Sequence, residues 1–154
     1  MTDIYSPKKR SLIMSKVRSM DTKPELFVRK LIFRAGYRYR LYSASLPGKP
    51  DIVLKKFRTV IFVNGCFWHG HAGCPRATTP SDNKQFWESK IAGNIVRDER
   101  ERQALVQSGW RILIVWECAC LKSKSNQLLR LIEDFLHSEN PSAQIGKSDL
   151  MTTA

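Results

Sequence analysis

The 154-residue sequence contains no hydrophobic run that approaches the roughly 20 residues needed to cross a bilayer. Its first residues also lack the pattern of a secretory signal peptide. Both absences favour an intracellular protein that does not associate with membranes. Cysteine is scarce as well, with four residues, and thiols inside cells stay reduced. We therefore expect the cysteines to bind metal rather than to form disulfides.

Acidic residues are also few. The chain has 14 Asp and Glu against 26 Lys and Arg, which gives a formal net charge of +12 and a pI of about 9.9. Residues 1–40 alone contain eleven basic and three acidic residues, a net of +8. Charge concentrated in this way favours a polyanionic partner, with nucleic acid as the leading candidate. The alternative is a basic protein whose charge serves only solubility.

The length is that of one domain with a substantial core. We expect a basic flexible arm over 1–10, a single folded domain over 11–137 and a loose C-terminal tail over 138–154. Hydrophobic periodicity and turn residues predict an α/β fold in which helices flank a mixed sheet. The predicted helices cover 11–20, 22–35, 81–108 and 127–137, and the predicted strands cover 37–42, 51–54, 59–63 and 110–116.

The segment that follows strand 59–63 contains two cysteines and two histidines within nine positions. Three of these residues have a spacing close to that of structural zinc sites, although it matches no common finger: Cys66, His71 and Cys74. A fourth ligand is required, and Cys118, just past strand 110–116, is the best candidate. Cys120 and His69 are its competitors. The alternative is that the thiols bind no metal and that one or two of them are buried.

A second metal site is suggested by Asp51, at the start of its strand. A hairpin between strands 51–54 and 59–63 would bring this carboxylate near Val63, and Mg²⁺ takes carboxylate and carbonyl oxygens together with water. An ion held there would polarise a scissile phosphate. His69, if it does not bind zinc, can act as an acid or base near neutral pH. The simpler alternatives are that Asp51 is a turn residue and His69 a surface residue. Glu25, a further carboxylate in the first turn of the predicted helix 22–35, is already explained as a helix cap.

Two large rings, Phe67 and Trp68, lie inside the cysteine–histidine segment. Aromatic side chains on a loop fixed by metal can insert between base pairs, and this insertion is easier at a mismatch. The alternative is that both rings pack beneath the loop. Phe86 and Trp87, at the start of the long helix, pose the same choice, and one of those two rings must face the core.

Four stretches of the chain occur in one order and are more specific together than any one of them alone. They are 14–25 (MSKVRSMDTKPE), 46–53 (LPGKPDIV), 60–71 (VIFVNGCFWHGH) and 110–118 (WRILIVWEC). With these stretches the chain resembles the very short patch repair (Vsr) DNA mismatch endonucleases, over residues 8–145.

The resemblance implies a restriction-endonuclease-like fold, a divergent form of the PD-(D/E)xK type, with a structural zinc loop. It also implies Mg²⁺-dependent nicking of one DNA strand 5′ to the T of a T·G mismatch. Such mismatches arise when 5-methylcytosine deaminates, so a functional link to a cytosine-5 DNA methyltransferase and a repair polymerase is expected. A single mismatch has no two-fold symmetry, which favours a monomer. The expected location is the bacterial cytoplasm, at the nucleoid during repair.

The resemblance also assigns roles at matching positions. Asp51 and the Val63 carbonyl become Mg²⁺ ligands, His69 the catalytic histidine and Glu25 a contributor, while Asp98 could orient His69. The implied zinc ligands are Cys66, His71, Cys74 and Cys118. The implied intercalating rings are Phe67, Trp68 and Trp87.

The chain departs from some relatives at Asn64, where they carry a second active-site histidine. An amide can hydrogen-bond a phosphate oxygen but cannot exchange a proton near pH 7. Either that second histidine is dispensable or this protein is slower than those relatives, and we expect the first.

Two other functions fit parts of the sequence. A non-catalytic, zinc-stabilised nucleic-acid-binding module would explain the charge and the cysteine–histidine loop, but would leave Asp51 without a role. A sequence-specific restriction enzyme on the same fold would cut both strands of fully paired DNA.

Overall fold

The computed structural model describes residues 20–150. The basic arm expected over 1–10 and nearly all of the helix predicted over 11–20 lie outside these residues. Among the residues that are described, no helix is long and apolar enough to cross a membrane.

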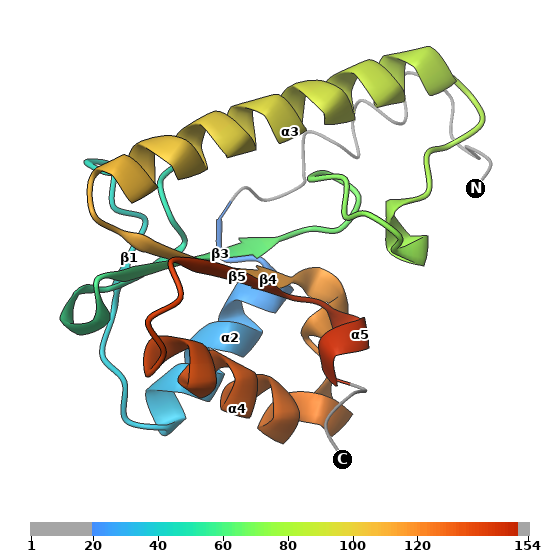
Figure 1. The fold of residues 1–154 in the computed structure, drawn as a ribbon. Helices are drawn as coiled ribbons and strands as arrows, with labels where there is room; N and C mark the ends of the chain where they lie inside the picture. Colours follow the sequence, from blue (N-terminus) through green and yellow to red (C-terminus); the bar gives the residue numbers. More distant parts are fainter. Residues whose placement is uncertain (1–19, 151–154) are drawn as a thin grey trace.

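A five-stranded mixed sheet forms the centre of the molecule, with its strands in the order β1-β2-β3-β4-β5 (Figure 1). The strands are β1 (Arg40–Leu41), β2 (Ile52–Leu54), β3 (Thr59–Asn64), β4 (Arg111–Trp116) and β5 (Ser142–Ile145). The first three are antiparallel, whereas β4 and β5 each run parallel to the preceding strand. β3 and β4 are buried along almost their whole length, as is typical of central strands covered on both faces. The predicted α/β fold with a mixed sheet is confirmed.

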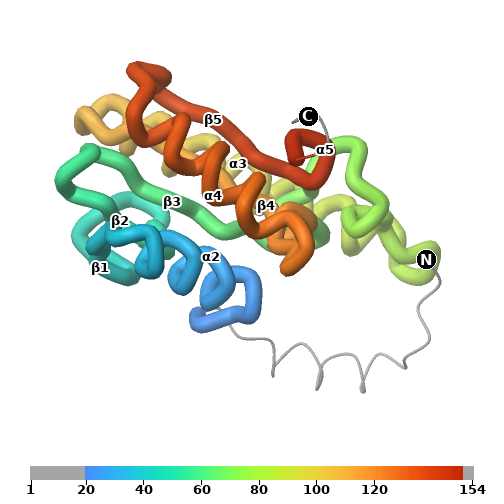
Figure 2. Tube along the Cα trace, turned by 90° about the horizontal axis from the view of Figure 1, so that it is seen from below, coloured from blue at the N-terminus to red at the C-terminus, as the bar shows by residue number. Residues whose placement is uncertain are grey.

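Helices cover both faces of this sheet. α2 (Lys23–Arg34) and α4 (Ser125–Leu136) lie side by side on one face, and α3 (Lys84–Gln107) crosses the other (Figures 1 and 2). The larger core fills the space between the sheet and the α2–α4 pair, and a smaller core lies beneath α3. Alternate residues of β3 and β4 contribute to the two cores, because successive side chains of a strand point to opposite faces.

The C-terminal region differs from its prediction. Instead of a loose tail over 138–154, Ser142–Ile145 forms β5 and Lys147–Leu150 forms α5. Ile145 is the only buried residue of β5, so the segment has no hydrophobic pattern that would reveal a strand. Pairing with β4 holds it in place and covers an edge of β4 that would otherwise be open. The folded domain therefore extends through Leu150.

Two other boundaries differ as well. α3 begins at Lys84 rather than at position 81, because Asn83 has a left-handed backbone (φ +55°) that a helix cannot contain. Of the strand predicted over 37–42, only Arg40–Leu41 pairs with β2. The N-terminus of α2 agrees with the predicted start at 22, since Thr22 is the N-cap and its hydroxyl accepts a hydrogen bond from the Glu25 backbone at 3.4 Å. The Glu25 side chain accepts from the backbone N–H of Asp21 rather than from that of Thr22.

The register of the sheet decides which segments meet. β3 and β4 are parallel and pair through to Asn64 and Trp116, so the segments that follow them leave the sheet at one edge. β2 is antiparallel to β3, so the residue that precedes β2, Asp51, lies at that same edge. Side chains beyond the carboxyl ends of parallel strands are common positions for active sites in α/β proteins.

Candidate active site and metal centre

A cleft of about 1110 Å³ opens at this edge of the sheet. Its walls come from the start of α2, the loop before β2, the segment after β3 and the middle of α3. The predicted site residues that line it are Glu25, Asp51, Val63, Phe67, Trp68, His69 and Asp98. The candidate catalytic residues, which come from four separate segments, thus share one cleft.

Asp51 is fixed by the end of β3. Its Oδ2 accepts a hydrogen bond from the backbone N–H of Val63 at 2.7 Å, and the predicted hairpin is confirmed by the antiparallel pairing of β2 with β3. Burial raises the pKa of Asp51 to about 7, against the effect of the Val63 N–H, and the negative charge of Glu25 adds to the rise. A carboxylate in such surroundings gains strongly from a cation placed beside it.

His69 is oriented from α3. Its Nδ1 lies 2.6 Å from Oδ2 of Asp98, and its backbone N–H donates to the carbonyl of Gly65 at 3.1 Å. An ionised carboxylate can only accept a hydrogen bond, so Nδ1 carries the proton of a neutral ring and Nε2 is left to interact with a substrate. The ring is partly exposed and lines the same cleft as Asp51.

Glu25 forms the centre of a buried polar network behind Asp51. Its side chain is 3% exposed and its Oε2 accepts hydrogen bonds from Arg29 at 3.2 Å and from the backbone N–H of Asp21 at 3.0 Å. The Tyr42 hydroxyl donates to the same oxygen. Glu25 is therefore more than a helix cap, because it joins the start of α2 to the loop beside Asp51.

A second cluster lies at the same edge of the sheet. Its four members could hold a metal ion: Cys66, His71, Cys74 and Cys118. Their ligand atoms all lie within 4.8 Å of one another, and Sγ of Cys118 is 3.6 Å from Nδ1 of His71. In a tetrahedral zinc site with bonds of about 2.0–2.3 Å, neighbouring ligand atoms are separated by roughly 3.3–3.8 Å, so only small movements are needed.

The strand register explains this cluster. Asn64 pairs with Trp116, and each of the two buried cysteines follows its strand by two residues, at Cys66 and Cys118. His71 stacks on the Trp116 ring with a centroid distance of 4.1 Å and an interplanar angle of 6°. Parallel pairing thus brings two ligands together that are far apart in the sequence.

The surroundings of the cluster suit a metal as well. Burial lowers the pKa of His71, against the effect of Asp149, and so favours the neutral imidazole that binds metals. Burial also raises the pKa of the Cys66 thiol to about 12, so its thiolate requires a nearby cation. The backbone N–H of Lys147 donates to Sγ of Cys118 at 3.3 Å.

The two competing ligands do not join the cluster. The thiol of Cys120 points to the carbonyls of Pro24 and Trp116, each at 3.9 Å. His69 is paired with Asp98 instead. The geometry therefore favours Cys118 as the fourth ligand.

The aromatic residues form a small cluster of their own. The rings of Phe67 and Trp68 lie 5.2 Å apart, edge to face, and both residues line the cleft. Trp87 packs against both, at 5.5 Å and 6.0 Å, but its side chain is only 1% exposed. Trp87 was expected to be a third ring that faces DNA, but it is buried. Its ring instead packs against Phe67 and Trp68 and supports them. Phe86, at 56% exposed, is the outward-facing member of its pair.

The close packing of α3 against the loop after β3 was not predicted from the sequence. Asn94 donates its side-chain amide to the carbonyl of Trp68 at 2.8 Å. Gly70 has a positive φ and lies so close to the helix that an added Cβ would be 2.7 Å from Ile95. The helical spacing of Ile91, Asn94 and Ile95 was the sequence signal that could have predicted this contact.

Basic residues also line the cleft: Lys49, Lys90, Arg97 and Arg102.

Comparison with known proteins gives a consistent result. A family model described as DNA mismatch endonuclease Vsr matches residues 2–75. The DNA mismatch endonuclease Vsr of Escherichia coli K12 is 39% identical over 148 residues, which cover 94% of each chain. The type II nicking enzyme V.NmeAIP of Neisseria meningitidis serogroup A is 44% identical over 139 residues, 87% of this chain and 99% of its own. The type II nicking enzyme V.XorIIP of Xanthomonas oryzae is 48% identical over 118 residues, 77% of this chain and 86% of its own. This chain belongs to the Vsr family.

Membership of the Vsr family makes the chain a DNA endonuclease with a restriction-endonuclease-like fold. Asn64, the position where some Vsr relatives carry a histidine, is the last residue of β3. It is 8% exposed and lines the cleft. An amide can donate a hydrogen bond to a phosphate oxygen, but it cannot replace a histidine as a proton carrier.

Proposed function

We propose that the protein nicks one strand of double-stranded DNA 5′ to the T of a T·G mismatch, by Mg²⁺-dependent hydrolysis of a phosphodiester bond. The observation that supports this most is the shared cleft, in which Asp51 and the His69–Asp98 pair face a common space. A binding module would have no need for a partly buried carboxylate with a raised pKa in the same cleft as an oriented imidazole.

His69 acts as the general acid–base. Asp98 holds Nδ1 in its protonated form, so the lone pair of Nε2 points to the substrate and can take a proton from the attacking water. The water attacks phosphorus and the bond to the leaving oxygen breaks. The attacking and leaving oxygens lie on opposite sides of phosphorus, so the leaving oxygen takes its proton from solvent and the His69 ring releases its own proton to solvent. Asp98 also stabilises the imidazolium that forms in between.

The residues around Asp51 fit a Mg²⁺ ion. The Val63 N–H occupies one carboxylate oxygen, the other is available, and the Val63 carbonyl faces the same side of β3 as its N–H. When bound, the ion would polarise the scissile phosphate and offset its developing charge. Glu25, held by Arg29, adds negative charge behind Asp51 without needing to touch the ion.

We assign a structural zinc ion to the Cys66, His71, Cys74 and Cys118 cluster. Three thiolates and one imidazole form a donor set typical of closed structural zinc sites, which leave no position for a reactive water. The ion would tie the loop after β3 to the end of β4. That loop contains Phe67, Trp68 and His69, so zinc would position the residues that face DNA without taking part in the chemistry.

DNA recognition is assigned to the rings of Phe67 and Trp68. Both line the cleft, and the buried Trp87 supports them from below. Inserting rings between base pairs costs a few kcal/mol of unstacking, and a mismatch lowers this cost. Lys90 and Arg97, in the same cleft, offer charge for the phosphates.

The proposed substrate suggests which enzymes act before and after this protein. T·G pairs that arise from 5-methylcytosine link this protein to a cytosine-5 DNA methyltransferase, and its nick would be used by a repair polymerase. A site for one mismatch has no symmetry that calls for a second copy, so we propose a monomer. It would act in the bacterial cytoplasm, at the nucleoid.

Asp51→Ala tests this function. The variant should lose nicking of a T·G duplex in Mg²⁺ but still bind it, because phosphate contacts and ring insertion supply most of the affinity. Normal nicking by Asp51→Ala would contradict the metal assignment. Equal binding to every duplex with no metal-dependent strand break in the unmodified protein would instead support the non-catalytic module.

A further inference from the structure

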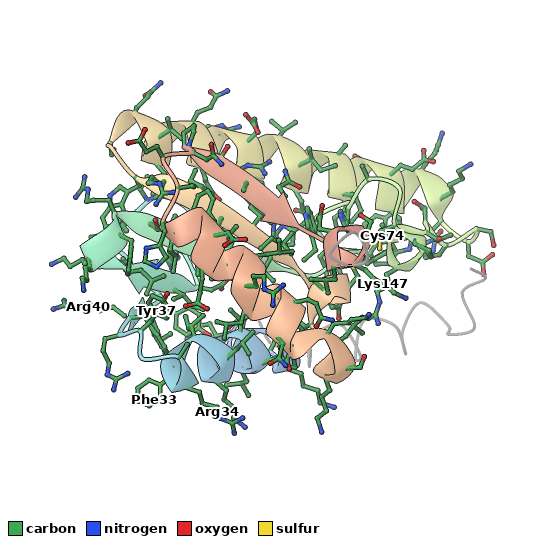
Figure 3. The ribbon with its side chains drawn as sticks, turned by 60° about the horizontal axis from the view of Figure 1, so that its bottom comes forward. Phe33, Arg34, Tyr37, Arg40, Cys74 and Lys147 are labelled. Atoms are coloured by element: carbon green, nitrogen blue, oxygen red, sulfur yellow. The ribbon has the colours of Figure 1, made fainter. Side chains whose placement is uncertain are left out.

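A basic and aromatic surface lies at the C-terminal end of α2, away from the metal cluster marked by Cys74 (Figure 3). We call it the α2–β1 patch, and its members are Phe33, Arg34, Arg38, Tyr39 and Arg40. Phe33 is 52% exposed, and Leu41, the last residue of β1, is 39% exposed. Neither the proposed nicking chemistry nor the cleft uses this surface.

The charge of the patch is of one sign. The sixteen residues from Leu26 to Leu41 contain five basic side chains and no acidic one. One of the five, Arg29, pairs with Glu25 near the cleft. The other four are exposed and, within residues 20–150, form no ion pair: Lys30, Arg34, Arg38 and Arg40. The nearby carboxylate of Glu133 accepts a hydrogen bond from the Tyr37 hydroxyl instead.

The aromatic part of the patch is held in place. The guanidinium of Arg38 sits 4.2 Å from the centroid of the Phe33 ring, and its Nη1 donates to the carbonyl of Tyr37 at 3.1 Å. Tyr39 packs edge-on against Phe33 at 6.4 Å. An exposed ring that is already fixed among cations loses little freedom when another flat group stacks on it.

We propose that the α2–β1 patch binds single-stranded DNA. An unpaired base can stack on Phe33 while its phosphates contact Arg34, Arg38 and Arg40, the combination by which proteins hold single strands without reading their sequence. Duplex DNA keeps its bases stacked inside and would use only the arginines.

The position of the patch suggests where that strand comes from. β1 runs from Arg40 to Leu41, and the next residue, Tyr42, lines the cleft. A strand end released by a nick in the cleft could follow this edge of the sheet to Phe33. The suggestion that the strand comes from a nick rests on the proposed function. The binding of single-stranded DNA to the α2–β1 patch does not.

Binding of a fluorescein-labelled twelve-nucleotide oligo-dT, followed by anisotropy without Mg²⁺, tests the proposal. Phe33→Ala should weaken binding roughly tenfold, the effect of one stacked base, and Phe33→Leu should weaken it about equally because a stacking face is required. Arg38→Ala should also weaken it. The matched control is Arg130→Ala, an exposed arginine on α4, which should leave affinity within about twofold.

Wild-type affinity in Phe33→Ala, or full affinity in Phe33→Leu, would overturn the proposal. So would a loss that is equal for a duplex of the same length, since the patch would then contact phosphates only. If Phe33→Ala weakens binding of poly-L-glutamate more than of oligo-dT, the patch belongs to an acidic protein partner and the proposal is wrong. Phe33→Ala should still nick a T·G duplex at the wild-type rate, so failure here and failure of the nicking activity are distinguishable.

Discussion

Nδ1 of His69 lies 2.6 Å from Oδ2 of Asp98, although one residue belongs to the loop after β3 and the other to the middle of α3. The contact fixes which ring nitrogen faces the cleft. It also brings α3 to the candidate active site, because the helix that covers one face of the sheet holds the ring of the proposed acid–base residue.

Asp98→Asn should therefore slow nicking by roughly 100-fold, since an amide can donate as well as accept and no longer selects the tautomer. Affinity for the T·G duplex should stay the same. Single-turnover nicking and equilibrium binding, measured side by side, separate the two effects. A wild-type rate in Asp98→Asn would show that Asp98 does not orient His69.

Asp51→Asn should make the metal-free protein more stable at pH 8. The folded-state pKa of Asp51 is raised to about 7 from an ordinary value of 3.8, so the fold favours the protonated form. Its stabilising contribution is complete below about pH 4 and is lost as the pH rises through 7. The neutral amide avoids this loss and can still accept the hydrogen bond from Val63. The gain should be on the order of 1–3 kcal/mol at pH 8.

The measurement is thermal unfolding of both proteins in buffer without divalent ions, from pH 4 to pH 8. The gap should open with rising pH, and Mg²⁺ at pH 8 should stabilise the unmodified protein more than the variant. Asp134→Asn, an exposed carboxylate on α4, is the matched control and should change little. A gap that is constant with pH would mean that burial of Asp51 is not its cause.

Cys118→Ala should abolish the proposed zinc binding and lower the melting temperature, whereas Cys120→Ala should retain both. Both cysteines follow β4, but only Cys118 lies in the four-residue cluster. Loss of several kcal/mol corresponds to a fall on the order of 10 °C in a domain of this size. Metal content by mass spectrometry of each purified variant gives the answer. Equal zinc in both variants would remove Cys118 from the ligand set.

Gly70→Ala should be more destabilising than Gly73→Ala, although both glycines have a positive φ. The shared backbone strain costs about 1 kcal/mol. At Gly70 the new Cβ would also lie 2.7 Å from Ile95, whereas nothing lies within 4 Å at Gly73. Overpacking adds typically 1–3 kcal/mol, which denaturant unfolding can resolve. If the two variants are equally stable, Ile95 of α3 does not pack as closely against Gly70 as described.

Much of the site could be predicted because its residues follow regular elements. Buried strands end at Asn64 and at Trp116. Because the two strands are parallel, the residues that follow each of them leave the sheet at the same edge. Their pairing makes Cys66 and Cys118 neighbours. The hairpin between β2 and β3 places Asp51 opposite the end of β3 for the same reason.

Other features could not be read from local patterns. β5 has one buried residue and forms because β4 offers it a free edge, which is a tertiary effect. The burial of Trp87 depends on how the loop with Phe67 and Trp68 folds over it. The sequence identified the aromatic group but not which ring supports the others.

In the function proposed for this protein, one cleft both recognises a mismatch and cuts the DNA beside it. Duplexes that carry T·G, other mismatches or only paired bases, labelled on each strand in turn, test this directly in the presence of Mg²⁺. We expect a single nick 5′ to the T of the T·G pair, no cut in the opposite strand and little reaction with paired DNA. An intact T·G duplex in every flanking sequence tried, or cuts in both strands of paired DNA, would contradict it.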